Sequence, residues 1–199
     1  MNKIIGLLFI SLALLTACKQ DKKGEGITPS KAEIILENIH NRKSVRDYIP
    51  GKAVTDEELD KLLKAGMAAP SGQNKQPWEI LVINEREILD KLAEGLPYGK
   101  MLTKAPMAII VCGDTIKSNY WYLDCSLVSQ NILLAAEAMG LGAVWTAAYP
   151  YEDRIAVIRS LIDIPAHVTP LNVIPVGHPK GEHQPKEKWD DTKIHRNKW

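Results

Sequence analysis

The chain has 199 residues, of which 45% are hydrophobic and 25% charged, and its 25 Lys and Arg balance 24 Asp and Glu for a net charge of +1. This composition excludes a disordered chain, a collagen-like repeat and a strongly basic nucleic-acid binder. Three cysteines are too few for the disulfide framework of a small secreted module, and the length suits one packed domain.

Residues 1–17 have the pattern of an export signal. The apolar run Ile4–Leu15 follows the basic start Asn2–Lys3, and it is shorter than the roughly 20 residues that span a bilayer. The run ends in Leu15-Thr16-Ala17-Cys18, which resembles the box where bacterial lipoprotein signals are cut before the cysteine. We therefore expect Cys18 to be lipidated and to anchor an exported lipoprotein on the periplasmic or cell-surface side of the membrane. An ordinary signal peptide with an incidental cysteine is the alternative.

Residues 18–28 are polar and contain glycine, which is typical of a flexible tether. Residues 29–199 then form the single domain. Two capping boxes, Ser30-x-x-Glu33 and Thr55-x-x-Glu58, each predict the start of an amphipathic helix.

The rest of the domain mixes helical and strand periods. Short apolar runs predict strands at Glu79–Ile83, Met107–Cys112, Ala143–Ala147 and Leu171–Val176. Further helices are expected at Glu85–Glu94, Asn119–Met139 and Glu152–Leu161. Because no strict βαβ repeat is present, the pattern indicates an α+β fold. After Gly177 the chain is polar and aperiodic, and Ile194 and Trp199 in this tail are best explained by docking on a partner subunit.

A basic segment follows the first helix. In Arg42-Lys43-Ser44-Val45-Arg46, four of five side chains can donate hydrogen bonds to an oxyanion, and the planar guanidinium matches phosphate. An anion site is one interpretation, and a solvated charged turn is the other.

A constrained loop lies between the second helix and the first strand. Pro70 ends the helix, Ser71-Gly72 makes a turn, and Pro77 favours an extended backbone. The loop displays two carboxamides, Asn74 and Gln76, which can both donate and accept hydrogen bonds to the edge of a heterocycle. Purely local hydrogen bonding is the alternative.

Together these segments resemble the nitroreductase family of flavin enzymes. The family's elements occur here in order: an Arg-x-Ser-x-Arg start, an Ala-Pro-Ser-x-x-Asn-x-Gln-Pro-Trp loop, a Gly-Leu-Gly stretch, and a Val-Gly-x-Pro followed by a basic tail. They correspond to residues 42–46, 69–78, 140–142 and 176–179. The resemblance covers about residues 38–199 and implies an α+β, three-layer fold with a mixed or antiparallel sheet.

The resemblance also implies a homodimer that exchanges its C-terminal tail and holds one FMN at each subunit interface. Hydride would pass from NAD(P)H to the flavin and then, in ping-pong kinetics, to an electron-poor small molecule such as a nitroaromatic or a quinone. The residues that correspond to the family's cofactor-binding positions are Arg42, Lys43, Ser44, Arg46, Pro70, Ser71, Gly72, Asn74, Gln76, Thr146, Ala147, Lys186 and Lys188.

These positions divide among three regions of the site. The residues of the basic segment, from Arg42 to Arg46, would contact the phosphate and ribityl chain. The Pro70–Gln76 loop would reach the flavin of the neighbouring subunit. Thr146 and Ala147 would lie beside its reactive edge, and the tail lysines would close on the phosphate. Lysines stand where many relatives carry arginines, which supplies point charges in place of planar forks.

No catalytic side chain is expected, because a flavin carries its own redox chemistry. The five histidines show no metal-ligand spacing with a third partner, so no metal site is expected. Cys112 and Cys125 lie in apolar segments and are expected to be free and buried. The stretch Leu96–Lys104, where a lid over the flavin would lie, is short, which indicates an open site.

Two alternatives to this enzyme follow from its expected location, since reduced nicotinamide is a cytoplasmic reductant. One is a lipid-anchored flavin-binding module without NAD(P)H turnover. The other is a flavin-dependent dehydrogenase or dehalogenase that uses another donor.

Overall fold

The computed structural model describes residues 28–199 of the chain. The predicted signal peptide, the lipidated Cys18 and most of the predicted tether lie outside the described residues. Within residues 28–199, no helix combines the length and the apolar character needed to cross a bilayer.

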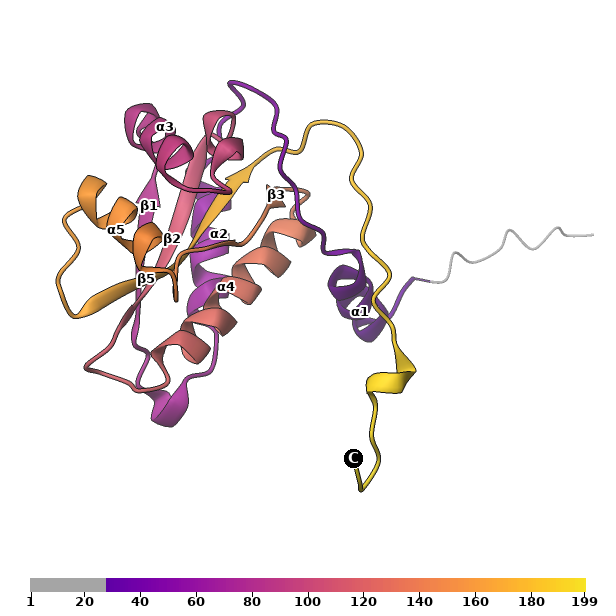
Figure 1. The fold of residues 1–199 in the computed structure, drawn as a ribbon. Coiled ribbons are helices and arrows are strands. Elements are labelled where there is room, and N and C mark those ends of the chain that lie inside the picture. The colour runs from indigo at the N-terminus through magenta and orange to yellow at the C-terminus, as the bar shows by residue number, and fades with distance from the viewer. Residues whose placement is uncertain (1–27) are drawn as a thin grey trace, which may run out of the picture.

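A five-stranded antiparallel sheet forms the centre of the domain (Figure 1). Its strands are β1 (Trp78–Ile83), β2 (Met107–Asp114), β3 (Gly142–Ala143), β4 (Thr146–Ala147) and β5 (Val168–Gly177). The order is β1-β2-β5-β3, and β4 also pairs with β5. Ile80 lies opposite Val111 and Ile109 opposite Ile174, so apolar side chains meet across the central strands.

The single strand predicted at Ala143–Ala147 is wrong, because the structure has two short strands there. Ala143 pairs with Val176, and Thr146 pairs with Val173. Pro175 of β5 lies opposite the gap between them and has no N–H to donate to a neighbouring strand. The interruption leaves Val144 and Trp145 outside the ladder.

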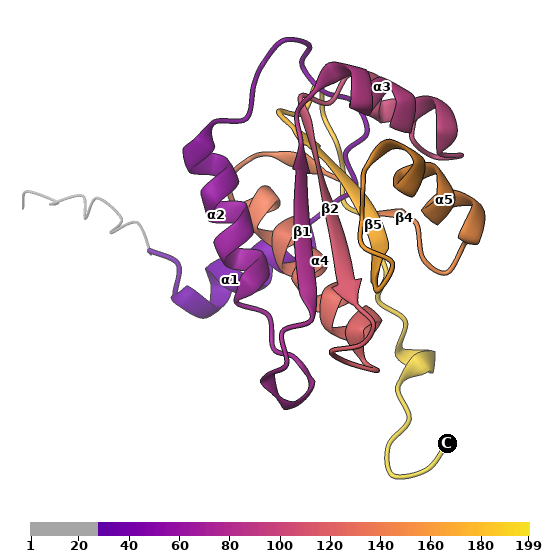
Figure 2. The same ribbon diagram turned by 90° about the vertical axis from the view of Figure 1, so that its left-hand side faces the viewer.

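Helices cover both faces of the sheet, as Figure 2 shows. The helices α2 (Asp56–Met67) and α4 (Trp121–Ala138) pack together on one face, and α3 (Arg86–Gly95) and α5 (Glu152–Leu161) pack on the other. Each face has its own core, the first around Leu62, Val128 and Ile132 and the second around Leu89, Leu92 and Ile158. The α+β, three-layer fold is confirmed.

The remaining elements are α1 (Lys31–Asn41) and three short 3₁₀ helices, η1 (Gly72–Asn74), η2 (Lys100–Thr103) and η3 (Asp191–Lys193). Both predicted capping boxes form, at Ser30 and Thr55. Gly140 takes the left-handed backbone, with φ of +69°, directly after α4, as expected of a residue that ends a helix.

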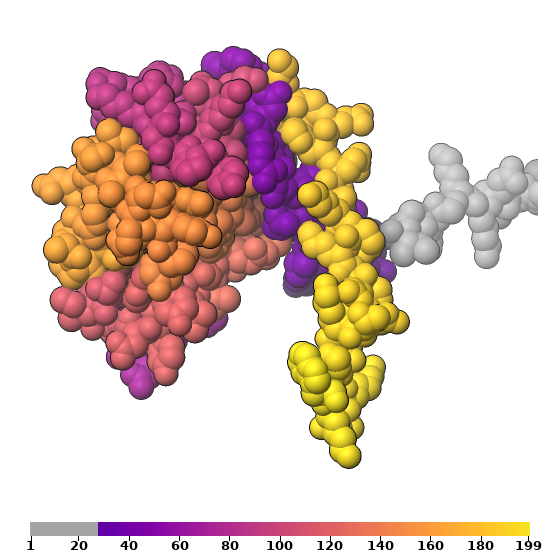
Figure 3. All heavy atoms as spheres, in the orientation of Figure 1, coloured from indigo at the N-terminus to yellow at the C-terminus, as the bar shows by residue number. Residues whose placement is uncertain are grey.

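Helix α1 and the C-terminal tail extend away from the three layers (Figure 3). Helix α1 buries none of its residues, and the apolar side chains of Ile34, Ile35, Leu36 and Ile39 are each about half exposed although they make this helix amphipathic. In the tail, Trp189 and Trp199 are exposed as well. Exposed apolar side chains of this size are typical of an interaction surface.

Candidate flavin site

The basic segment Arg42–Arg46 is joined to the sheet by its central residue. The N–H of Val45 donates to the carbonyl of Ala143 over 3.0 Å, and the Val45 side chain is buried against Gly142. A Cβ atom at Gly142 would come within 2.5 Å of Val45 Cγ1, which real side chains do not tolerate. The glycine therefore allows the close approach that fixes the position of the basic segment.

A buried tyrosine ties the same segment to the start of the tail. The hydroxyl of Tyr48 donates to the carbonyls of Val45, over 2.9 Å, and Pro175, over 3.2 Å. Burial raises the pKa of Tyr48, so the hydroxyl stays a neutral donor. Tyr48 also forms a β-bridge with Pro179, and the chain beyond β5 consequently runs beside the basic segment.

Five cations converge on one small cavity as a result. The cavity has a volume of about 130 Å³ and is lined by Arg42, Lys43, Ser44, Arg46, Gln184, Lys186 and Lys188. Lys43 forms an ion pair with Glu137 over 2.7 Å, but the other four cations have no carboxylate partner within residues 28–199. A cluster of uncompensated cations with a hydroxyl fits an oxyanion such as a phosphate.

A second, larger cavity of about 380 Å³ adjoins the first through Arg46, which lines both. Its other lining residues are Tyr98, Met101, Val144, Trp145, Thr146, Ala147, Tyr151 and Arg154. The interrupted strand thus contributes to the wall, since Val144 and Trp145 lie in the gap between β3 and β4. Phosphate-sized and ring-sized spaces lie side by side.

Thr146 and Ala147 lie on a strand with only one partner. Strand β4 pairs with β5 alone, so its second edge has no sheet partner and its backbone polar groups remain available. The Thr146 hydroxyl is buried without a hydrogen-bond partner in the described structure, and the Ala147 carbonyl accepts from Nη1 of Arg154 over 3.1 Å. This edge can donate to the rim of a bound ring.

The loop Pro70–Gln76 is held firmly by the first turn of α4. The N–H of Gly72 donates to Oδ1 of the buried Asp124 over 2.9 Å, and the N–H of Gln76 donates to the Ser71 hydroxyl over 2.9 Å. The two predicted carboxamides meet, because Nε2 of Gln76 donates to Oδ1 of Asn74 over 3.0 Å.

Three residues of this loop have a left-handed backbone. Gln73, Asn74 and Gln76 have φ of 55°, 55° and 48°, which is unfavourable for side chains other than glycine and asparagine. The hydrogen bonds of this loop hold its residues in a backbone conformation that they would not adopt by themselves, which is typical of a functional segment. The residues that line the two cavities nevertheless include none from this loop, so a single chain brings together only two of the three predicted regions of the site.

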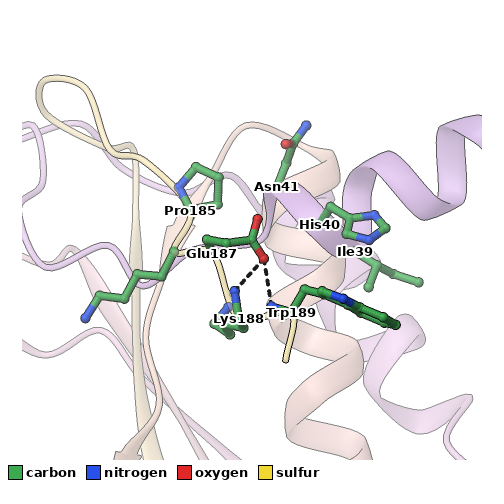
Figure 4. Close-up of a pocket in the computed structure, with 8 residues that line it drawn as sticks. Ile39, His40, Asn41, Pro185, Glu187, Lys188 and Trp189 are labelled. Atoms are coloured by element: carbon green, nitrogen blue, oxygen red, sulfur yellow. Dashed lines mark hydrogen bonds between the residues drawn. The ribbon is translucent and has the colours of Figure 1, made fainter. Parts of the chain in front are cut away.

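A groove separates the end of α1 from the tail (Figure 4). Ile39 and the exposed Trp189 are among the residues that line it. Glu187 shapes the tail here, because its carboxylate accepts from the N–H groups of Lys188 and Trp189. The groove is open and partly apolar, which suits protein rather than a small anion.

Cys112 and Cys125 are free and buried, as predicted. Burial raises the pKa of each thiol to about 12, so neither is a ready nucleophile. The described residues contain no group of three or more His, Cys, Asp or Glu that could hold a metal ion.

Several residues that line the cavities carry no signal in the sequence. Gln184 has no pattern that could have identified it. Tyr98 and Met101 belong to the short stretch Leu96–Lys104, and Trp145 follows the glycine-containing motif, but nothing in the sequence indicates that these side chains share a cavity. Tyr151 and Arg154 have the pattern of ordinary residues at the start of a helix.

Comparison with known proteins shows that the chain is similar to nitroreductases. The model of the Nitroreductase family matches residues 39–97 and 93–178. A protein of Methanothermobacter thermautotrophicus named "Putative NADH dehydrogenase/NAD(P)H nitroreductase" is 46% identical over 168 residues, which cover 83% of this chain and 87% of that protein.

Solved structures that are similar to this chain are also described as nitroreductases. A protein of the same name from Bacteroides thetaiotaomicron is 56% identical, with a TM-score of 0.82 over 86% of this chain and 100% of the other. A Desulfovibrio desulfuricans structure described as a putative nitroreductase in complex with FMN is 29% identical, with a TM-score of 0.72 over 86% of this chain and 99% of the other.

Proposed function

The chain belongs to the nitroreductase family, and on that premise we propose that it is an FMN-dependent oxidoreductase that takes hydride from NADH or NADPH and reduces an electron-poor small molecule. Nitroaromatics and quinones are the expected acceptors. The observation that carries the proposal is the cavity lined by five cations, which adjoins the larger cavity through Arg46.

The cation cavity would hold the phosphate of FMN. Arg42 and Arg46 can present planar pairs of donors to phosphate oxygens, and Lys186 and Lys188 add positive charge from the tail. Lys43 also lines this cavity, and its ammonium group is held by an ion pair with Glu137 of α4. Four of these five cations have no other counter-ion in the described chain, which is the condition under which a phosphate binds most favourably.

In the larger cavity, the residues would orient the ring and exclude water. FMN, when bound, supplies the hydride chemistry. The free edge of β4 at Thr146 and Ala147 would donate hydrogen bonds to the ring, and Trp145 would cover part of it. No side chain is required as a nucleophile or as a general base. Donor and acceptor would use the same face of the ring in turn, so we expect ping-pong kinetics.

We also propose that the site is completed by a second copy of the chain. The loop Pro70–Gln76 is rigid but lines neither cavity, while α1 and the tail expose large apolar side chains such as Ile35 and Trp189. A homodimer in which α1 and the tail dock on the partner would bury these side chains and bring each loop to the other subunit's flavin. Light scattering on the purified protein should give the mass of a dimer.

Export and lipid anchoring remain proposals from the sequence alone. In cells that produce the chain, labelled palmitate should be incorporated into the protein, and Cys18→Ser should abolish the label. Label that persists in Cys18→Ser, or that is absent from the unsubstituted chain, would contradict the anchor.

The flavin proposal is tested by spectroscopy. The purified protein is incubated with FMN, freed of excess cofactor and then mixed anaerobically with NADH or NADPH. We expect retained flavin absorbance that bleaches on addition of nicotinamide and returns on addition of a quinone. Retained absorbance that does not bleach would contradict NAD(P)H turnover, and loss of all flavin would contradict cofactor binding.

A further inference from the structure

We propose that the larger cavity recognises an electron acceptor that is a flat aromatic ring carrying an anionic group such as a carboxylate, and that Arg154 binds the anion. This inference rests on the proposed function, because it names the class of acceptor that the flavin would reduce. It concerns a side chain that lines the larger cavity only, unlike Arg46, which lines both cavities.

The guanidinium of Arg154 is well positioned but its charge is not compensated. Nη1 donates to the carbonyl of Ala147 over 3.1 Å, and none of the ion pairs within residues 28–199 involves this side chain. Its Nε atom is buried and has no hydrogen-bond partner in the described structure. A guanidinium that lines a cavity and keeps N–H donors without partners is suited to bind a carboxylate.

Two tyrosine rings hold this guanidinium in place. Cζ of Arg154 lies 3.8 Å from the centre of the Tyr151 ring and 5.5 Å from that of Tyr98, distances at which a cation is attracted to the ring face. Both rings line the cavity and are exposed, Tyr98 to 68% and Tyr151 to 48%. They offer flat surface and polar tips to an aromatic ligand.

The charge balance of the cavity favours an anion. Its nine lining residues include two arginines and neither Asp nor Glu. Arg46 also lines the phosphate-sized cavity and is taken up by the cofactor in the proposed function. Arg154 is therefore the cation that remains for the acceptor.

The test compares two acceptors of nearly the same shape, 4-nitrobenzoate and the neutral 4-nitrobenzamide. Arg154→Gln should raise KM for 4-nitrobenzoate by about tenfold or more, the effect of losing one charge-assisted hydrogen bond. It should change KM for 4-nitrobenzamide and for NADH and NADPH by only about twofold, the smallest effect expected from losing a neutral hydrogen bond. Arg154→Lys, which keeps the charge without the planar fork, should lie between.

Lys52→Gln is the matched control, because Lys52 is exposed and lines neither cavity yet carries the same charge. It should leave the preference for 4-nitrobenzoate unchanged. An equal loss with both acceptors in Arg154→Gln would overturn the proposal. A change confined to KM for NADH or NADPH would assign Arg154 to the nicotinamide coenzyme, and release of FMN would assign it to the cofactor; either result would overturn the proposal too.

Calorimetry separates this proposal from the flavin proposal. Benzoate and benzamide are titrated into the full chain with and without FMN. A preference for benzoate that Arg154→Gln removes supports the anion site even if no flavin were retained. Equal binding of the two probes, or equal absence of binding, would overturn it whether or not FMN is bound.

Discussion

The basic segment Arg42–Arg46 and the loop Pro70–Gln76 differ in what the fold places opposite them. Both are polar, and both are hydrogen-bonded to other elements of the chain. The basic segment is met by the tail of its own chain and closes a cavity. The loop lines neither cavity. Local order therefore does not show that a site is complete, and in the proposed homodimer the loop would complete the site of the other subunit.

The two segments are also held by different means. Val45 inserts against Gly142 and hydrogen-bonds to the sheet, so the basic segment depends on close packing. The loop depends on one buried carboxylate, Asp124, and accepts a left-handed backbone at Gln73. Substitutions in the basic segment should therefore disturb packing, and substitutions in the loop should disturb hydrogen bonding. Both kinds of substitution should weaken FMN binding.

The largest effect is expected from Arg42→Ala combined with Arg46→Ala. FMN affinity should fall by about 100-fold or more, since removing each charge-assisted hydrogen bond to the phosphate weakens binding by about tenfold or more. The melting temperature of the flavin-free protein should stay the same, because neither side chain has an ion-pair partner in residues 28–199. Flavin fluorescence titration measures the affinity, with Lys52→Ala as control. Unchanged affinity would contradict the phosphate site.

A second substitution breaks the packing of the basic segment. Gly142→Ala places a Cβ atom 2.5 Å from Val45 Cγ1 and should lower the free energy of unfolding by about 1–3 kcal/mol and weaken FMN binding. Urea denaturation measures the loss. In the double variant with Val45→Ala, the total loss should be smaller than the sum of the two separate losses, because the contact with Cγ1 is removed even though Cβ of residue 45 stays 2.8 Å from the new atom. Strict additivity would contradict the contact.

A third substitution releases the loop. Asp124→Ala removes the acceptor of the Gly72 N–H and should lower the free energy of unfolding by about 1–2 kcal/mol, since this part-buried donor is left without its partner. Asp124→Asn keeps an acceptor oxygen and should retain most of the stability. If both variants lose stability equally, the hydrogen bond is not what holds the loop.

The smallest effect should come from relieving strain in the loop. Gln73→Gly removes the cost of a left-handed backbone at φ of 55° and should raise the free energy of unfolding by about 1 kcal/mol. The matched control is Gln130→Gly, which is exposed within α4 and should lower it by about 1 kcal/mol. Thermal denaturation compares the two. A loss of stability in Gln73→Gly would show that the loop is not strained.

The sequence predicted the layers of the fold well, because its periodic segments and capping boxes each act locally. It failed at Ala143–Ala147, where the break between β3 and β4 lies opposite Pro175 of a strand that is distant in the sequence. The sequence motifs predicted that Lys186 and Lys188 of the tail would meet the basic segment at Arg42 and Arg46, and all four line one cavity. Arg154 carries no signal in the sequence, since its importance arises from the cavity that it shares with Tyr98, which is distant in the sequence, and with the strand β4.

The most direct test of the central claim, that each flavin site combines the basic segment of one chain with the loop of another, is a mixing experiment. Arg42→Ala/Arg46→Ala and Asn74→Ala/Gln76→Ala chains are each purified and then unfolded and refolded together. Random pairing of the two chains should restore tight FMN binding to about a quarter of the sites, because half of the dimers are mixed and each mixed dimer has one intact site. No gain over the separate variants would contradict a shared site.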